Sequence, residues 1–223
     1  MDRMDRKITI ITPTTGKSSL FKLIDSIKLQ EVNYTHLILW DDKRDSDINP
    51  FSLEYDGNNI CNSIVIKGNL VQGQAYGSAL RSVGLLAAIT PFVTFADDDV
   101  FWDKNHLENI LDVIDNNEWA YCRRKIWYNN EYLGVDNFES VGDDDRKVPY
   151  EMVDNNCMIF KRELGVIGAA IYRSTSDYND DRLFYSFLKQ YGGTCGKTKE
   201  ATVNQVCPER LKEMFKTYCT KGI

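Results

Sequence analysis

The first 114 residues alternate between short apolar segments rich in β-branched side chains and segments whose apolar residues recur every three or four positions. The first pattern is typical of buried strands, and the second of helices that bury one face. Because parallel strands need a crossover connection, usually a helix, this alternation predicts an α/β fold with a mainly parallel, twisted sheet flanked by helices. We expect strands at residues 7–12, 35–40, 63–66 and 91–96, and helices at about 20–29, 75 or 78 to 88, and 105–114.

The pattern changes after Trp119, where strand-like segments follow one another with no helix between them. Such neighbours favour antiparallel pairing, so we expect a small antiparallel C-terminal part. A chain of 223 residues fits one domain, with a nucleotide-binding half (about 1–118) and a second half (about 119–223) that could hold another substrate. We expect strands at 119–127, 132–135 and 156–160, helices at 180–191 and 208–218, and a polar tail over 194–202.

Three consecutive carboxylates, Asp97, Asp98 and Asp99, follow the strand-like segment Pro91–Ala96. In open α/β sheets, ligands bind at the carboxyl ends of the strands. A hard divalent cation that also bridges substrate phosphates needs oxygen ligands of this kind. The triplet is therefore a candidate metal site. Asp is also a good helix N-cap, so an acidic turn before the next helix is the alternative interpretation.

The first strand runs into Thr12, Pro13 and Thr14, which are expected at the same edge of the sheet. Gly16–Ser18 lies between a strand and a helix and so suggests a P-loop. That motif requires a glycine where this chain has Ile11, inside the strand, so its backbone could not wrap a phosphate chain in the usual way. A turn that presents the threonines at a ligand-binding edge is the better interpretation.

The second strand ends in Asp41 and Asp42, beside that turn. A carboxylate at such a strand end can accept hydrogen bonds from a ribose or from an N–H group of a base. A helix cap or a solvated turn is the alternative.

Arg81 lies on the helix that follows a glycine-containing loop. Its guanidinium suits a diphosphate, although most surface arginines are simply solvated.

Asp180 and Asp181 open an amphipathic helix in the second half of the chain. Acidic residues favour helix N-termini through capping and the helix dipole, so a structural role is the first interpretation. A carboxylate that faces the metal edge would also be well placed as a general base toward an incoming hydroxyl. Asp154 is a further candidate for contacts at that place.

The composition narrows the class of partner. A formal charge of −6 and a pI near 5.1 disfavour broad binding to nucleic acid or to anionic membranes, which need a basic face. No apolar run approaches the roughly 18 residues of a membrane span. The charged N-terminus does not resemble a signal peptide, so we expect a cytoplasmic protein. The six cysteines contain no Cys-x-x-Cys pair and only two histidines accompany them, so we expect free thiols rather than a zinc site.

In their order and spacing, these segments resemble the inverting family 2 glycosyltransferases, which have the GT-A fold, over roughly residues 7–191. The chain departs from that family at Thr15-Gly16, where the family has Tyr-Asn, and at Val100, where it has a further acid. The segments that carry the resemblance are Lys7–Thr14 (opening strand and Pro-Thr turn), Ser26–Gln30 (first helix), Leu37–Asp42 (strand ending in the Asp pair), Leu80–Leu85 (arginine-containing helix), Phe95–Asp99 (metal-binding strand) and Asp180–Phe184 (segment with the catalytic base).

The resemblance implies a hexosyltransferase that takes its donor, expected to be a UDP-sugar, and transfers the sugar with inversion to a saccharide acceptor that is free, lipid-linked or protein-linked. Asp99, helped by Asp97 or Asp98, would hold Mn²⁺ or Mg²⁺ at the donor diphosphate, and one of Asp97 and Asp98 would reach the ribose. Asp181, or else Asp180, would be the base. No QxxRW segment of processive synthases is present, so we expect single additions. The alternatives are a sugar-phosphate nucleotidyltransferase and a non-catalytic carbohydrate-binding protein.

Overall fold

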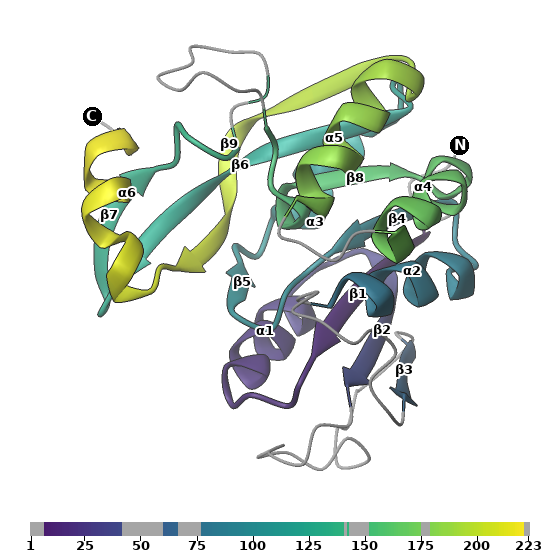
Figure 1. The fold of residues 1–223 in the computed structure, drawn as a ribbon, viewed down its shortest axis with the longest axis horizontal. Helices are drawn as coiled ribbons and strands as arrows, with labels where there is room; N and C mark the ends of the chain where they lie inside the picture. Colours follow the sequence, from purple (N-terminus) through teal and green to yellow (C-terminus); the bar gives the residue numbers. More distant parts are fainter. Residues whose placement is uncertain are drawn as a thin grey trace.

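A continuous mixed sheet forms the centre of the protein in a computed structural model that describes residues 7–41, 60–66, 77–140, 142, 152–174 and 179–220 (Figure 1). Its first part has the strand order β3-β2-β1-β4, and these strands are all parallel. The alternating strands and helices expected for the first half of the chain are therefore confirmed. The strands are β1 (Lys7–Thr14), β2 (Asn33–Asp41), β3 (Ile60–Ile66) and β4 (Phe92–Phe95).

The sheet continues in the second half of the chain in the order β4-β8-β6-β9-β5, with β7 paired to β6. β8 is antiparallel to both β4 and β6, whereas β9 is parallel to β6. The expected antiparallel C-terminal part is therefore mixed. These strands are β5 (Val100–Trp102), β6 (Trp119–Tyr128), β7 (Glu131–Val135), β8 (Met158–Lys161) and β9 (Cys195–Val206).

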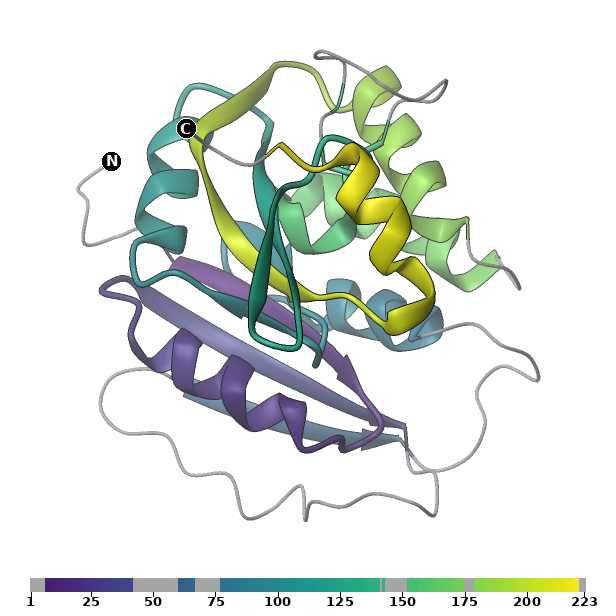
Figure 2. The same cartoon turned by 90° about the vertical axis from the view of Figure 1, so that its left-hand side faces the viewer.

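Helices lie on both faces of the sheet (Figure 2). α1 packs on one face beside β5, and α2, α4 and α5 pack together on the other. None of the helices in the described ranges is long and apolar enough to cross a membrane. The helices are α1 (Ser19–Lys28), α2 (Ser78–Ala87), α3 (His106–Ile114), α4 (Arg162–Ser174), α5 (Asp180–Tyr191) and α6 (Lys212–Tyr218), with 3₁₀ turns η3 (Asn155–Cys157) and η4 (Glu209–Leu211).

Several details differ from the expectations. β1 runs through Pro13 to Thr14 because its ladder with β4 ends at Ile11, and proline is tolerated where no partner needs its missing N–H. The polar tail expected over 194–202 is part of β9. Its polar side chains are matched by polar partners: the Thr202 hydroxyl lies 2.8 Å from Nδ1 of His106. That histidine, the first residue of α3, is fully buried.

α4 was not predicted as a helix, because two glycines interrupt its pattern. A Cβ on Gly168 would lie 2.5 Å from the Phe184 ring, so the glycine allows α4 to approach α5 closely. Phe184 in turn packs against Phe95, Phe160 and Tyr172, with ring centroids 5.0 to 6.1 Å apart. This aromatic cluster joins β4, β8, α4 and α5, and so fixes the start of α5 relative to the end of β4.

Candidate active site

The carboxyl ends of β1 and β4 and the N-termini of α2 and α5 meet at one edge of the sheet. Parallel strands place their carboxyl ends at the same edge, so Thr14 at the end of β1 and the triplet after β4 become neighbours. The aromatic cluster brings the start of α5 to the same place. The residues predicted from separate parts of the sequence therefore converge.

Asp98 is held by the turn after β1. It is 5% exposed, and the Thr14 hydroxyl donates to its Oδ2 over 2.6 Å. Lys17 Nζ lies 3.3 Å from Oδ1. The Gly16 N–H donates to the Thr14 hydroxyl over 2.9 Å, which orients that hydroxyl toward the carboxylate. Both oxygens of Asp98 therefore have partners within the protein.

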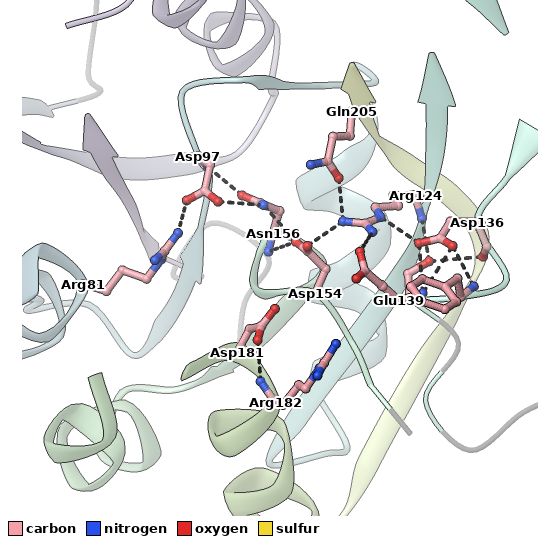
Figure 3. A network of polar contacts seen from close by, with 12 residues as sticks. Arg81, Asp97, Arg124, Asp136, Glu139, Asp154, Asn156, Asp181, Arg182 and Gln205 are labelled. Carbon is pink, nitrogen blue, oxygen red and sulfur yellow. Dashed lines mark hydrogen bonds and ion pairs between the residues drawn. The ribbon is translucent and has the colours of Figure 1, made fainter. Parts of the chain in front are cut away.

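Asp97 lies between Arg81 and Asn156 (Figure 3). Arg81 Nη2 donates to Asp97 Oδ1 over 2.5 Å, and Asn156 Nδ2 donates to Asp97 Oδ2 over 3.1 Å. The backbone N–H of Asp97 donates to Asn156 Oδ1 over 2.6 Å. A direct bond from Asp97 to a metal would compete with these donors, whereas a contact to a ligand hydroxyl or a water would not.

Arg81 links the triplet to the start of α5. Its Nη1 lies 3.7 Å from Asp180 Oδ2, which also accepts a hydrogen bond from the Ser78 hydroxyl. Burial would lower the pKa of Arg81, but the charges of Asp97 and Asp180 outweigh burial and raise it.

Gly77 precedes α2, the helix that carries Arg81. Its φ is +82°, and a Cβ there would lie 2.8 Å from Pro13. The glycine thus lets α2 start directly against the end of β1.

Asp99 has no hydrogen bond or ion pair among the residues that the structure describes. Desolvation by the surrounding protein raises the pKa of Asp99 to about 7, and the negative charges of Asp97 and Asp98 act in the same direction. Its surface is nevertheless exposed to solvent. For an exposed side chain, repulsion between these adjacent carboxylates is the stronger physical cause of the raised pKa. Such a crowded, accessible carboxylate favours a cation at this point.

Asp181 is the second carboxylate of this site for which the described residues provide no ion pair. It is half-buried, and its Oδ1 accepts the Arg182 backbone N–H over 2.7 Å. Desolvation raises the pKa of Asp181 to about 7, followed by the charge of Asp154, while the Arg182 N–H opposes the shift. In Figure 3 its carboxylate points toward Asp154. A carboxylate with a pKa near neutrality suits a general base.

A buried arginine that the sequence reasoning missed supports this wall of the site. Arg124, 1% exposed, lies on β6 and donates to three carboxylates and one amide (Figure 3). Asp154, one of the three, also accepts from the backbone and side-chain N–H groups of Asn156, which places Asn156 between Asp154 and Asp97. The partners of Arg124 are Asp136 (2.7 Å), Glu139 (2.5 Å), Asp154 (2.5 Å) and Gln205 (2.5 Å).

Some predicted residues lie elsewhere. Thr12 is fully buried, and its hydroxyl lies 2.8 Å from Nε2 of His36 on β2, so it belongs to the core and not to the accessible edge. Pro13 is buried against Gly77. Asp41 ends β2 and is half-buried, and Asp42 lies outside the described residues. Arg124 and Asn156 had one signal in the sequence: charged or amide residues within otherwise apolar strand-like segments.

The residues fit a divalent ion in one specific way. No group of three or more His, Cys, Asp or Glu side chains in the described ranges could hold a metal ion. Mg²⁺ commonly binds through one or two carboxylates together with substrate phosphates and water. Asp99 therefore fits Mn²⁺ or Mg²⁺ that shares its coordination with a phosphorylated ligand, and it does not fit a permanently bound structural metal.

No protein-family model matches the sequence, and no curated protein is similar to it at the level of sequence. Solved structures are similar to it in fold. A crystal structure of residues 1–349 of S. aureus TarS superposes with a TM-score of 0.66 at 18% identity, covering 93% of this chain and 62% of that one. TarS is a family 2 glycosyltransferase with the GT-A fold. The chain has a GT-A fold.

The GT-A fold is also matched in TarS structures with bound ligands. The complex with UDP-GlcNAc gives a TM-score of 0.66 at 17% identity, covering 91% of this chain and 59% of that chain. The complex with UDP superposes with a TM-score of 0.62 at 16% identity, and the match covers 94% of this chain and 63% of the TarS chain. This chain thus spans about 60% of the length of these TarS chains. Identity this low shows a shared GT-A fold and leaves the activity to be argued from the site.

Proposed function

We propose that this protein is a glycosyltransferase that moves a hexosyl group from a nucleoside-diphosphate sugar, with UDP as the nucleotide, to a hydroxyl of a saccharide acceptor with inversion. The observation that carries the proposal is the difference between neighbouring carboxylates. Asp97, Asp98 and Asp180 are held by protein donors, whereas Asp99 and Asp181 form no ion pair in the described ranges. Inverting transfer needs a base at the incoming hydroxyl and, where a metal ion stabilises the leaving group, a carboxylate that holds this ion.

The donor would lie along the carboxyl ends of β1, β2 and β4. Asp41 and Asp42, at and just after the end of β2, are proposed to contact the base and ribose, with Thr14 nearby. The diphosphate would lie at Asp99, and Asp97 and Asp98 would contact the ribose or bound water from their fixed positions. Mn²⁺ or Mg²⁺ bound there would offset the negative charge that builds up on the leaving nucleoside diphosphate. The fold supports this arrangement, because TarS was crystallised with UDP-GlcNAc and with UDP.

Asp181 is proposed as the general base. As the acceptor oxygen bonds to the anomeric carbon, its proton passes to the Asp181 carboxylate, and the bond from that carbon to the diphosphate oxygen breaks on the opposite face. Asp180 cannot serve as easily, since Ser78 and Arg81 hold its carboxylate and it is buried. Asp180 instead holds Arg81, which holds Asp97. The start of α5 would thus supply both the base and a support for the donor side.

Release of nucleoside diphosphate tests the proposal. The full chain is incubated with a panel of UDP-, GDP- and ADP-sugars and Mn²⁺, with and without saccharide acceptors, and the freed nucleotide and the product anomer are measured. We expect diphosphate release from one nucleotide, stimulated by an acceptor, and an inverted product. Pyrophosphate release from a nucleoside triphosphate and a sugar phosphate would show a nucleotidyltransferase instead. Glycan binding without any turnover would show a binding protein.

The proposal includes single additions, since the processive QxxRW motif is missing from the sequence, and it extends to a cytoplasmic site of action. Sequential product lengths in the same assay check the first point. A ladder of products that stay bound through many additions would contradict it.

A further inference from the structure

Lys17 is an exposed cation that lies beside the carboxylate triplet. It follows Gly16 in the turn between β1 and α1, and its side chain is 60% exposed. Its ammonium lies 3.3 Å from Asp98 Oδ1, and its positive charge also acts on Asp97 and Asp99. The side chain is therefore anchored at the site while most of its surface remains open to a ligand.

The other cations around the triplet have fixed roles. Arg81 is 7% exposed and is engaged with Asp97 and Asp180. Lys22, one turn into α1, places its ammonium 3.5 Å from the centre of the Phe101 ring. Arg81 is therefore held by its ion pairs, whereas Lys22 lies against the Phe101 ring and borders the space at Asp99. Lys17 has to give up only one long hydrogen bond.

A cavity beside Asp99 is bordered by the start of α1, the helix that follows Lys17. A cavity of about 360 Å³ is bounded by Asp99, by Ser19 and Lys22 of α1, and by residues of β5 and of the segment after β9. This volume lies within the range of small-ligand sites. Ser19 is two residues from Lys17, so a ligand bound at Asp99 lies beside the start of α1.

Protonation supports a role for this side chain as a charge. Partial burial lowers the pKa of Lys17, but the charges of Asp98 and Asp99 outweigh burial and raise it above the usual value. An ammonium with a free surface is a good donor to phosphate oxygen.

We propose that Lys17 donates to the β-phosphate of the bound nucleoside diphosphate and stabilises it as the leaving group. This inference rests on the proposed function and deepens it. When the bond between the sugar and the diphosphate breaks, its electron pair stays on the β-phosphate oxygen. The Lys17 ammonium offsets that charge by hydrogen bonding and keeps its own proton. Together with Asp99 and its ion, it gives the diphosphate two contacts that a monophosphate lacks.

Calorimetric titration of the full chain with UDP and UMP, and with the matching GDP and ADP pairs, tests the inference. Lys17→Met should lose roughly tenfold to a hundredfold in affinity for the diphosphate and little for the monophosphate. The loss should persist in EDTA, because the contact does not pass through the ion. Lys17→Arg keeps the charge and should bind within a few-fold of the wild type. Lys28→Met, at the other end of α1, is the matched control and should bind as the wild type does.

Equal losses for diphosphate and monophosphate, no loss at all, or a loss that disappears in EDTA would each overturn the inference. Thermal unfolding of each variant, followed by circular dichroism, separates a lost contact from a lost fold, and rescue by Lys17→Arg is the second check. A wild type that binds no nucleoside diphosphate and no nucleotide sugar would overturn the proposed function as well. A wild type that binds them with Lys17→Met unaffected would overturn the role of Lys17 alone.

Discussion

Asp99 and Asp181 differ from the carboxylates around them in forming no ion pair within the described part of the chain, and their pKa values are raised to about 7. Asp97 and Asp180 share Arg81, and Asp98 has Thr14 and Lys17. Carboxylates whose surroundings separate their protonation behaviour mark different chemical roles. At the residue scale, the candidate site therefore contains three carboxylates fixed by protein donors, Asp97, Asp98 and Asp180. Asp99 and Asp181 are left for contact with a ligand.

Asp181→Asn should reduce transfer by roughly a hundredfold to ten-thousandfold, the usual contribution of a general base, and leave donor affinity unchanged. The base acts as the carboxylate, so kcat/KM of the wild type should fall as the pH drops below about 7. Initial rates between pH 5.5 and 8.5 check both statements. Asp25→Asn, on the exposed side of α1, is the control. Full activity of Asp181→Asn would assign the base elsewhere.

The ionised Asp181 carboxylate should destabilise the folded protein at neutral and alkaline pH. The folded pKa of Asp181 lies above its unfolded value of 3.8, so its contribution to stability is fully present only below that value and is lost as the pH rises through about 7. Asp181→Asn should therefore raise the melting temperature by a few degrees at pH 8 and by less at pH 5. Calorimetric melting at both pH values measures this. A variant less stable at pH 8 would contradict the raised pKa.

At the scale of elements, Arg124 joins β6 to β9, to η3 and to the segment after β7. Its carboxylate partners come from two separate places in the chain: Asp136 and Glu139 in the segment after β7, and Asp154 at the start of η3. Removal of the guanidinium leaves these charges without their shared partner, and breaking a buried ion pair costs about 3–5 kcal/mol. The network therefore determines how the second half of the chain is held against the site.

Arg124→Met should lower the free energy of unfolding by about 3–5 kcal/mol, with Arg123→Met, the adjacent and less buried arginine, as the matched control. Urea denaturation of the two variants gives the comparison. Equal, small effects would show that Arg124 contributes no more than a surface charge.

Gly168→Ala should destabilise the contact between α4 and α5, because the added Cβ would lie 2.5 Å from the Phe184 ring. Overpacking of this kind typically costs about 1–3 kcal/mol. The start of α5 would move with it, so kcat should fall more than donor affinity. A double variant with Phe184→Leu should recover part of the loss. Unchanged stability and rate in Gly168→Ala would show that the helices separate freely.

The elements differ in how far the sequence could predict them. The alternation in the first half, the strand before Asp97 and the helix opened by Asp180 followed from local periodicity and were confirmed. β9 did not follow from local periodicity, because its polar side chains have hydrogen-bond partners in other elements, such as His106 for Thr202. Nor did the role of Asn156, whose contact with Asp97 joins residues 59 positions apart. Periodicity reports burial along one segment and carries no information on such pairs.

At the scale of the whole molecule, binding and folding should be linked through Asp99. A nucleoside diphosphate with Mn²⁺ should raise the melting temperature, by an amount that corresponds to about 2.7 kcal/mol at a hundredfold excess over the dissociation constant. Asp99→Ala should lose most of this shift, and EDTA should remove the same part from the wild type. Thermal melts with UDP, Mn²⁺ and EDTA give the comparison. A shift retained in full by Asp99→Ala would place the ion elsewhere.

The position of β9 in the sheet has a consequence for how the protein is made. β5, the strand that directly follows Asp99, pairs with residues 203–205 of β9, and β6 pairs with β9 along its length. On the ribosome, the parallel strands β1 to β4 can pair early in synthesis. β5, which follows Asp99, gains its partner strand only when residue 205 has emerged. Pairings between distant residues form slowly. The reactive edge should therefore be the last part of the protein to take shape during synthesis, and a nascent chain stalled before β9 should have a folded core without a working site.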